Sequence, residues 1–361
     1  MGVEAVIEAL AQPELWIAAF AGGAFGAALG ALPAFIFTGF MVIVGEAANI
    51  LKAELAGAGV IASDAFTLGI TGSIAFGPVF GPHVSFAGGA AAAAYAARKG
   101  YMDTGFDYHE AKNIAHALGT KPDVLAVGGV FGILGMLVRQ VSFGFAMPWD
   151  PIAMGVVLSA VFHRLILGYS IIGKVRSSSI FDMGPFKAEE MRQTAEGGEV
   201  VADGGTAVAK ERLKVEPWLP HQYEWSGVAM IGLTVGILAA YIAVTTGSYF
   251  LAFGISAASL VFLNCGVEQI PVTHHISLPA STAALAIVPA AEAVPMLPAL
   301  AIGAAFGISG ALTGEVVQRV FYAHSDTHFD PPAAAIVVNT FFIAVLAMAG
   351  VLPQAGWVPL P

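Results

Sequence analysis

Two short segments, one in each half of the chain, combine histidine and serine with residues that break helices. Residues 78–86 read PVFGPHVSF and residues 271–278 read PVTHHISL, and aligning His83 with His275 also aligns Ser85 with Ser277. Glycine and proline stop a helix and free backbone amide and carbonyl groups, which inside a membrane is tolerated only beside protein or a water-filled cavity. A helix that restarts after such a break points its partly positive N-terminus at a polar site.

Both segments therefore suit a solute pathway built from paired breaks. Histidine changes charge near neutral pH, and Glu268 stands just ahead of the second break, where it would take up and release a proton. The alternative is a loop at the membrane surface, in which each histidine only caps the following helix. On the first interpretation the pathway residues are His83, Ser85, Glu268, His274, His275 and Ser277.

A second polar segment, HSDTHFD at residues 324–330, alternates histidine with aspartate. In an extended chain every second side chain shares one face, so two imidazoles and two carboxylates would converge on a divalent ion such as zinc or manganese. The four candidate metal ligands are His324, Asp326, His328 and Asp330. The competing interpretation is structural, because Asp330 followed by Pro331 is typical of a helix start, as is Asp150 before Pro151. The loop before Asp150, residues 143–149, has no histidine or aspartate.

Four further ionisable residues lie within apolar stretches: Glu46, Arg139, Glu315 and Arg319. A charge at the centre of a membrane costs about 2.5 to 3.5 kcal/mol on insertion scales, so each is a candidate functional residue. We expect Glu315 to pair with an arginine. A structural ion pair and a role in transport both remain open for these positions.

The elements that position these side chains are duplicated. Residues 123–151 and 298–331 are two copies of one segment, each ending in an aromatic residue followed by Asp-Pro. Four residues of the first copy recur in the second without a gap: Phe131, Gly132, Gly135 and Leu137 correspond to Phe306, Gly307, Gly310 and Leu312. Twofold-repeated membrane proteins commonly carry a solute pathway at the repeat interface.

Composition indicates a lipid environment. The chain is 57% hydrophobic and 11% charged, with a mean hydropathy of +0.78, against roughly 25% charged residues in a soluble domain. Apolar stretches of about 17 to 25 residues are long enough to cross a bilayer as helices. We predict about ten spans, near residues 14–31, 33–51, 82–97, 122–142, 151–173, 226–246, 248–265, 272–290, 294–320 and 331–353.

A hydrophilic linker, residues 174–222, separates a first membrane repeat, residues 1–173, from a second, residues 223–361. Basic residues open this linker and also occupy the loop at residues 98–122, and basic loops are retained on the cytoplasmic side. Five spans in each half then run in opposite senses, which predicts an inverted repeat. Residues 59–81 form either an interrupted, re-entrant segment or an additional span that would make the repeat parallel.

The sequence thus predicts an all-α, polytopic transmembrane helix bundle with a twofold inverted repeat and broken helices, located in the cell membrane. We expect a channel or secondary transporter that moves a small solute or ion, and neither an enzyme nor a nucleic-acid-binding protein. Small-residue faces such as residues 18–23 suit close helix packing, so a homo-oligomer is expected. The alternatives are a membrane metal-binding protein or metalloenzyme built on residues 324–330, and a non-catalytic assembly subunit. No cofactor is expected beyond that divalent metal.

Overall fold

The computed structural model describes residues 3–65, 67–192, 212–290 and 292–361, and the regular secondary structure in these ranges is helical apart from one isolated β-bridge. The first half contains α1 (Val3–Leu10), α2 (Pro13–Leu29), α3 (Ala31–Gly57), the π-helix η1 (Ile70–Ala75), α4 (Ser85–Arg98), the 3₁₀-helix η2 (Glu110–Lys112), α5 (Pro122–Gly144) and α6 (Pro151–Leu167). The linker holds α7 (Gly184–Lys187). The second half contains α8 (Trp225–Thr246), α9 (Leu251–Ala258), α10 (Leu260–Asn264), α11 (His274–Ala286), α12 (Met296–Phe321) and α13 (Pro331–Met348).

Five helices are long and apolar enough to cross a membrane: α3, α5, α8, α12 and α13. Three shorter apolar helical stretches, α2, α6 and Leu251–Asn264, accompany them. The structure thus supports a membrane protein, whereas the predicted count of ten spans is not confirmed. At about 1.5 Å per residue, a helix of 17 residues reaches only some 25 Å, less than the roughly 30 Å of a hydrocarbon core.

The predicted spans at residues 82–97 and 272–290 are short helices buried in the protein interior. Helix α4 has 14 residues, of which only Tyr95 and Arg98 are not buried, and every residue of the 13-residue α11 is buried. Alanine and glycine dominate α4, and alanine, serine and threonine make up about half of α11, so neighbouring helices can approach closely. Neither predicted span contains Asp, Glu, Lys or Arg, so both resemble spans in sequence, although α4 and α11 are less apolar than the five long helices.

Corresponding helices in the two halves pack in the same pairs. Within the first half α2, α4, α5 and α6 contact one another as α8, α11, α12 and α13 do in the second. A close crossing of two glycine-containing helices is repeated as well. A Cβ atom built on Gly132 would lie 2.9 Å from the Cα atom of Gly23, and one built on Gly307 would lie 2.6 Å from that of Gly236. The duplicated sequence segments therefore hold equivalent places within their halves.

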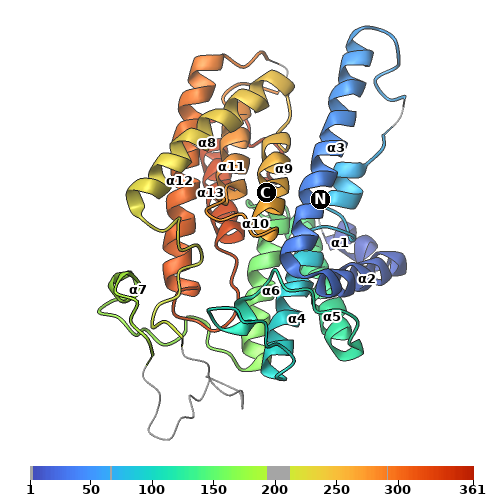
Figure 1. Cartoon of the computed structure of the whole chain (residues 1–361). Coiled ribbons are helices and arrows are strands. Elements are labelled where there is room, and N and C mark those ends of the chain that lie inside the picture. Colours follow the sequence, from blue (N-terminus) through green and yellow to red (C-terminus); the bar gives the residue numbers. More distant parts are fainter. Residues whose placement is uncertain (1–2, 66, 193–211, 291) are drawn as a thin grey trace, which may run out of the picture.

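The halves lie side by side, the first in blue to green and the second in yellow to red (Figure 1). They meet where α3 packs on α9 and where α6 packs on α13. In the first contact Gly39 lies against the backbone of Ala257 and Ala258. Both contacts join corresponding elements of the two repeats, so the interface is built from equivalent faces.

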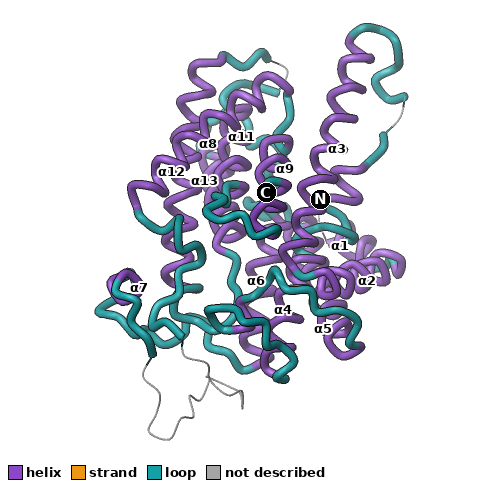
Figure 2. Tube along the Cα trace, in the orientation of Figure 1, coloured by secondary structure: helices purple, strands orange, loops and turns teal. Residues whose placement is uncertain are grey.

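Several long loops gather at the end of the molecule where α7 lies (Figure 2). Two backbone hydrogen bonds tie them together, from the Glu216 amide to the Ala323 carbonyl at 3.0 Å and from the His328 amide to the Ala111 carbonyl at 3.3 Å. The Gly-rich centre of the predicted linker, residues 193–211, lies outside the described residues. Between α3 and α4 the one regular helix within the described residues is η1, so the structure holds no continuous helix across residues 59–81.

Candidate functional site

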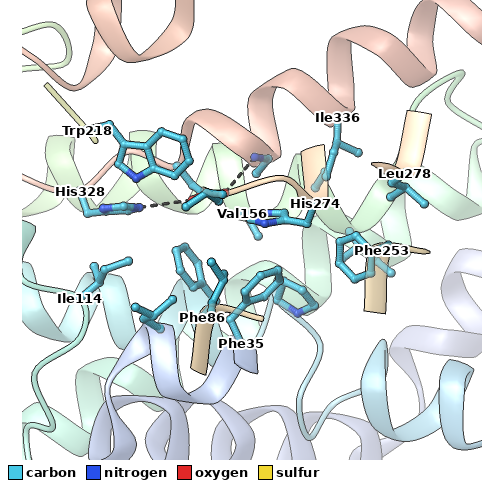
Figure 3. Close-up of a pocket in the computed structure, with 18 of the residues that line it drawn as sticks. Phe35, Phe86, Ile114, Val156, Trp218, Phe253, His274, Leu278, His328 and Ile336 are labelled. Carbon is cyan, nitrogen blue, oxygen red and sulfur yellow. Dashed lines mark hydrogen bonds and ion pairs between the residues drawn. The ribbon is translucent and has the colours of Figure 1, made fainter. Parts of the chain in front are cut away.

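A cavity of about 330 Å³ lies where the two halves meet. In Figure 3, Phe35, Phe86 and Ile114 lie on one side of the open space, and Trp218, His328 and Ile336 lie on the other. Its walls are mainly apolar, and nine of the lining residues are aromatic: Phe35, Phe76, Phe86, Phe106, Trp218, Phe250, Phe253, Tyr322 and Trp357. The polar lining residues are Lys112, Asn113, Asp150, His274, His328 and Asp330. This composition is typical of small-molecule sites, which are largely hydrophobic with a few orienting polar groups.

Equivalent positions of the two repeats supply much of the wall. Residues spaced identically at the starts of corresponding helices line the cavity in both halves: Asp150, Ala153 and Val156 correspond to Asp330, Ala333 and Ile336, and Phe35 of α3 corresponds to Phe250 just before α9. A three-residue step keeps side chains on one face of a helix, so each half presents the same face to the cavity. The cavity therefore belongs to the interface between repeats rather than to either half.

Two aspartates begin the helices that enter the cavity wall from opposite halves. Asp150 accepts a hydrogen bond from the amide of Ile152 at 2.8 Å, and Asp330 accepts one from the amide of Ala333 at 2.8 Å. Both are therefore N-caps, as the sequence predicted. The amide of Asp150 also donates to Thr340 Oγ1 at 2.9 Å, which joins the N-terminus of α6 directly to α13.

Two imidazoles lie in the wall beside these carboxylates. His328 Nε2 is 3.3 Å from Asp330 Oδ1, and its ring makes edge contacts with Phe86 and Tyr322. His274 lies among Phe35 and Phe253, with its ring centroid 4.7 Å from that of Phe35. The Nδ1 atoms of both histidines are buried and have no hydrogen-bond partner among the described residues.

Lys112 lines the cavity where the loops gather and belongs to a buried ionic cluster. Its Nζ atom is 2.7 Å from Glu216 Oε2, and both side chains are fully buried. Arg212 binds Glu216 at 2.6 Å and Asp326 at 2.8 Å. Arg192 adds an ion pair to Asp326 at 3.3 Å, so five buried charges link the loop at residues 98–122, the linker and the loop after α12.

Burial and ion pairing act in opposite directions on this cluster. Burial lowers the pKa of Lys112 to about 8, although the Glu216 carboxylate partly opposes that shift. For Glu216, burial alone would raise the pKa, but the charges of Lys112, Arg212 and Arg192 outweigh it and lower the pKa to about 2. At neutral pH the cluster therefore keeps its ion pairs.

Of the six predicted pathway residues, His274 alone lines the cavity. His83 and His275 occupy equivalent buried positions inside the two halves. A Cβ atom on Gly135 would overlap the carbonyl oxygen of His83, and one on Gly310 would lie 2.5 Å from that of His275. The structure thus places these two histidines between helices of their own half and not at the interface of the repeats.

The remaining pathway candidates also lie away from the cavity. Ser85 and Ser277 donate to backbone carbonyls one turn earlier, those of Gly81 and His274. Glu268 is exposed in the loop between α10 and α11. These residues therefore do not gather around the cavity, and their part in a solute pathway stays a prediction.

The four metal-ligand candidates do not converge. His324 Nε2 contacts the carbonyl of Ile180 at 3.2 Å, and Asp326 pairs with the arginines of the ionic cluster. Only His328 and Asp330 meet. The described residues contain no group of three histidine, cysteine, aspartate or glutamate side chains arranged to hold a metal ion.

We expect metal removal to leave the protein unchanged. Incubation with EDTA followed by dialysis should shift the melting temperature of the purified protein by less than about 1 °C, because two adjacent side chains make a poor site for zinc, which needs three or four ligands. Elemental analysis of the untreated protein gives the second measurement. A first-row metal bound at one equivalent would contradict this reading of residues 324–330.

The other ionisable residues predicted within spans have local partners. Glu315 accepts from Arg319 Nε at 2.6 Å, which is the predicted pairing with an arginine, and Arg319 also donates to the carbonyls of Phe181 and Tyr223. This pair fastens the linker to α12. Arg139 donates to its neighbour Gln140.

Glu46 is buried in α3 and receives three hydrogen bonds from uncharged groups. Ser248 Oγ donates at 2.5 Å, Thr71 Oγ1 at 2.7 Å and Asn49 Nδ2 at 3.0 Å. Ser248 belongs to the second half, so this carboxylate is a further polar link between the halves.

Sequence reasoning missed most of the wall. Lys112 and Trp218 reach the cavity from the loop at residues 98–122 and from the predicted linker, and both were assigned to solvent-facing connections. One signal was present, since Asp150 and Asp330 recur at equivalent places. Asp150 was interpreted as a helix cap, and Asp330 as a helix cap or a metal ligand.

Comparison with known proteins identifies one family model. A model described as "Family of unknown function (DUF7973)" matches residues 5–361. No curated protein and no solved structure matches the chain. The geometry of the cavity is therefore the basis for assigning a function.

Proposed function

We propose that this chain, which belongs to that family of unknown function, is a multi-pass membrane transport protein, either a channel or a secondary transporter. The proposal starts from the cavity. One observation carries the proposal: the cavity lies between the two repeats and is walled by equivalent residues of both. Solute sites of twofold-repeated transporters lie at such interfaces. Five apolar helices long enough to span a bilayer support the membrane setting.

We further propose that the repeats are inverted and that the linker lies in the cytoplasm of a cell whose plasma membrane holds the protein. Each half has one set of equivalent helices, and the basic loops gather at one end (Figure 2). Basic loops are retained on the cytoplasmic side. On this proposal the short helices α4 and α11 are the re-entrant elements of their halves, enclosed by longer spans.

The ionic cluster fits the role of a closure at the loop end of the pathway. Lys112 and Trp218 cover the cavity there, and Glu216 holds Lys112 at 2.7 Å. Because the cluster joins three separate segments, opening this end requires those segments to part together. Transport by rocking of one half against the other would break and re-form these ion pairs.

Filling the cavity should stop transport. The Ala333→Trp variant places a large ring at a wall position that is nearly fully buried, and we expect flux to fall at least tenfold. The measurement is uptake by reconstituted vesicles, with a panel of radiolabelled ions and small solutes. Val345→Trp, at an exposed position on the same helix, is the matched control and should transport normally.

Two outcomes would contradict the proposal. Equal flux through the Ala333→Trp variant and the wild type would place the pathway elsewhere. Absence of flux of every solute from correctly inserted wild-type protein would favour a non-catalytic assembly subunit.

A further inference from the structure

Two carboxylates line the cavity without a cation in contact. Among the described residues no lysine or arginine lies within 4.0 Å of the Asp150 or Asp330 carboxylate, although Arg139 acts on Asp150 from a greater distance, and the one cationic lining residue, Lys112, is already paired with Glu216. The N-terminus of each capped helix offers roughly half a unit of positive charge, which offsets only part of one carboxylate. A bound cation would neutralise the remaining negative charge of these two carboxylates.

Aromatic rings form the surfaces next to these carboxylates. Trp218, Trp357, Phe35 and Phe86 all line the cavity. The face of an aromatic ring attracts a cation, and the attraction grows when water is excluded. A bare metal ion would instead need six or more oxygen ligands, or three or four nitrogen or sulfur ligands, and this mainly apolar wall provides neither. The surroundings suit a cation that carries its own apolar groups.

A third observation indicates a polar ligand. His274 is 6% exposed, lines the cavity, and its Nδ1 atom has no hydrogen-bond partner among the described residues. A buried polar atom without a partner costs about 1 to 3 kcal/mol, so such atoms commonly have a role that compensates. Rotation of the imidazole would turn this nitrogen toward the cavity, where a hydroxyl or ammonium group on the bound molecule would satisfy it.

From these three features we infer that the cavity binds a small organic cation, with an alkylated ammonium group held by Asp150 and Asp330 and enclosed by aromatic rings. This inference rests on the proposed function and names the substrate class of the same site. An organic anion fits the wall less well, because Glu216 neutralises Lys112 at 2.7 Å and the Tyr322 ring covers its Nζ atom at 4.4 Å.

Three compounds of nearly identical shape test the sign of the charge. Choline is cationic, 3,3-dimethyl-1-butanol is its neutral counterpart, and 3,3-dimethylbutanoate is an anion. We expect isothermal titration calorimetry on the purified full-length protein to give choline a Kd at least tenfold lower than that of the alcohol, with the anion weakest. Binding of the alcohol or the anion as tight as that of choline, or no binding of choline, would overturn the inference.

Two variants assign the charge to named residues. Asp150→Asn and Asp330→Asn preserve a side chain that caps helices well, so the fold should persist. Each should weaken choline binding at least tenfold and leave binding of the alcohol unchanged. Asp123→Asn, in the first turn of α5 and outside the cavity wall, is the matched control and should bind choline like the wild type. Unchanged choline binding in both cavity variants would overturn the assignment.

The experiments distinguish an incorrect substrate class from an incorrect transport proposal. If another solute is transported and the Ala333→Trp variant blocks it while choline does not bind, the class is wrong and the pathway stands. If choline binds through Asp150 and Asp330 but no vesicle takes it up, the site stands and transport is wrong.

Discussion

Replacing Glu216 by Gln is expected to lower the free energy of unfolding by about 3 to 5 kcal/mol, because removal of one member of a buried ion pair leaves the other charge uncompensated. Glu216 is the shared partner of Lys112 and Arg212, and its side chain is fully buried. The variant would leave three buried cations facing the single carboxylate of Asp326. Thermal unfolding of the purified protein in detergent is the measurement, with protease sensitivity of the linker as a second one.

An exposed ion pair provides the matched control. Lys214 and Glu190 are 2.6 Å apart, but their side chains are 30% and 45% exposed. Surface pairs contribute about 0 to 1 kcal/mol, so Glu190→Gln should change stability little. Adding Lys112→Met to Glu216→Gln should recover part of the loss, since it removes one of the unpaired buried charges. Equal small effects of both glutamine variants would show that the cluster contributes little.

The helical class and the internal duplication could be predicted because both are visible in the order of residues within short segments of the sequence. The period and length of the apolar runs identify helices, and the repeated glycines at positions such as Gly132 and Gly307 mark the tight crossings that the structure contains. Both helix starts at Asp150 and Asp330 were also predictable, because a cap depends only on the next few residues.

The number of spans could not be read from hydropathy. Residues 82–97 and 272–290 contain no Asp, Glu, Lys or Arg, which is why they were predicted to be spans, but α4 and α11 are short helices enclosed by their own half, and enclosure is a property of tertiary packing. The same reason explains why the surroundings of His83 and His275 could not be predicted. Sequence showed that both histidines follow a break, but it did not show whether each break faces the other half or its own helices.

The cavity itself could not be predicted from the sequence because its wall combines segments far apart in the chain. Lys112 and Glu216 are separated by 104 positions and Arg212 and Asp326 by 114, so nothing local relates them. Charged residues in hydrophilic connections are usually solvated, which is why Glu216 was assigned to an exposed linker. Its burial depends on three cations: Arg212 four residues earlier, Arg192 in the same linker, and Lys112 in a distant loop.

Acid should destabilise the protein through the same cluster. The pKa of Glu216 is lowered from 4.5 to about 2, which at 1.36 kcal/mol per unit corresponds to roughly 3 kcal/mol of stability at neutral pH. Since the folded-state pKa lies below the unfolded value, this contribution is fully present above about pH 4.5 and is lost as pH falls toward 2. The pKa of Asp326 is also lowered, because the charges of Arg212, His109 and Arg192 outweigh the effect of burial, so its contribution is lost in the same direction.

Thermal unfolding measured between pH 7 and pH 3 in one detergent tests this expectation. The melting temperature of the wild type should decrease once the pH is lowered past about 4.5. The Glu216→Gln variant should begin from a lower melting temperature and lose less of it in acid, since it has no carboxyl group to protonate at that position. Protonation of Asp326 would account for part of the decrease in melting temperature that remains in this variant. A variant with the full acid sensitivity of the wild type would mean that other carboxylates control acid stability and that Glu216 does not hold the loop end of the cavity closed.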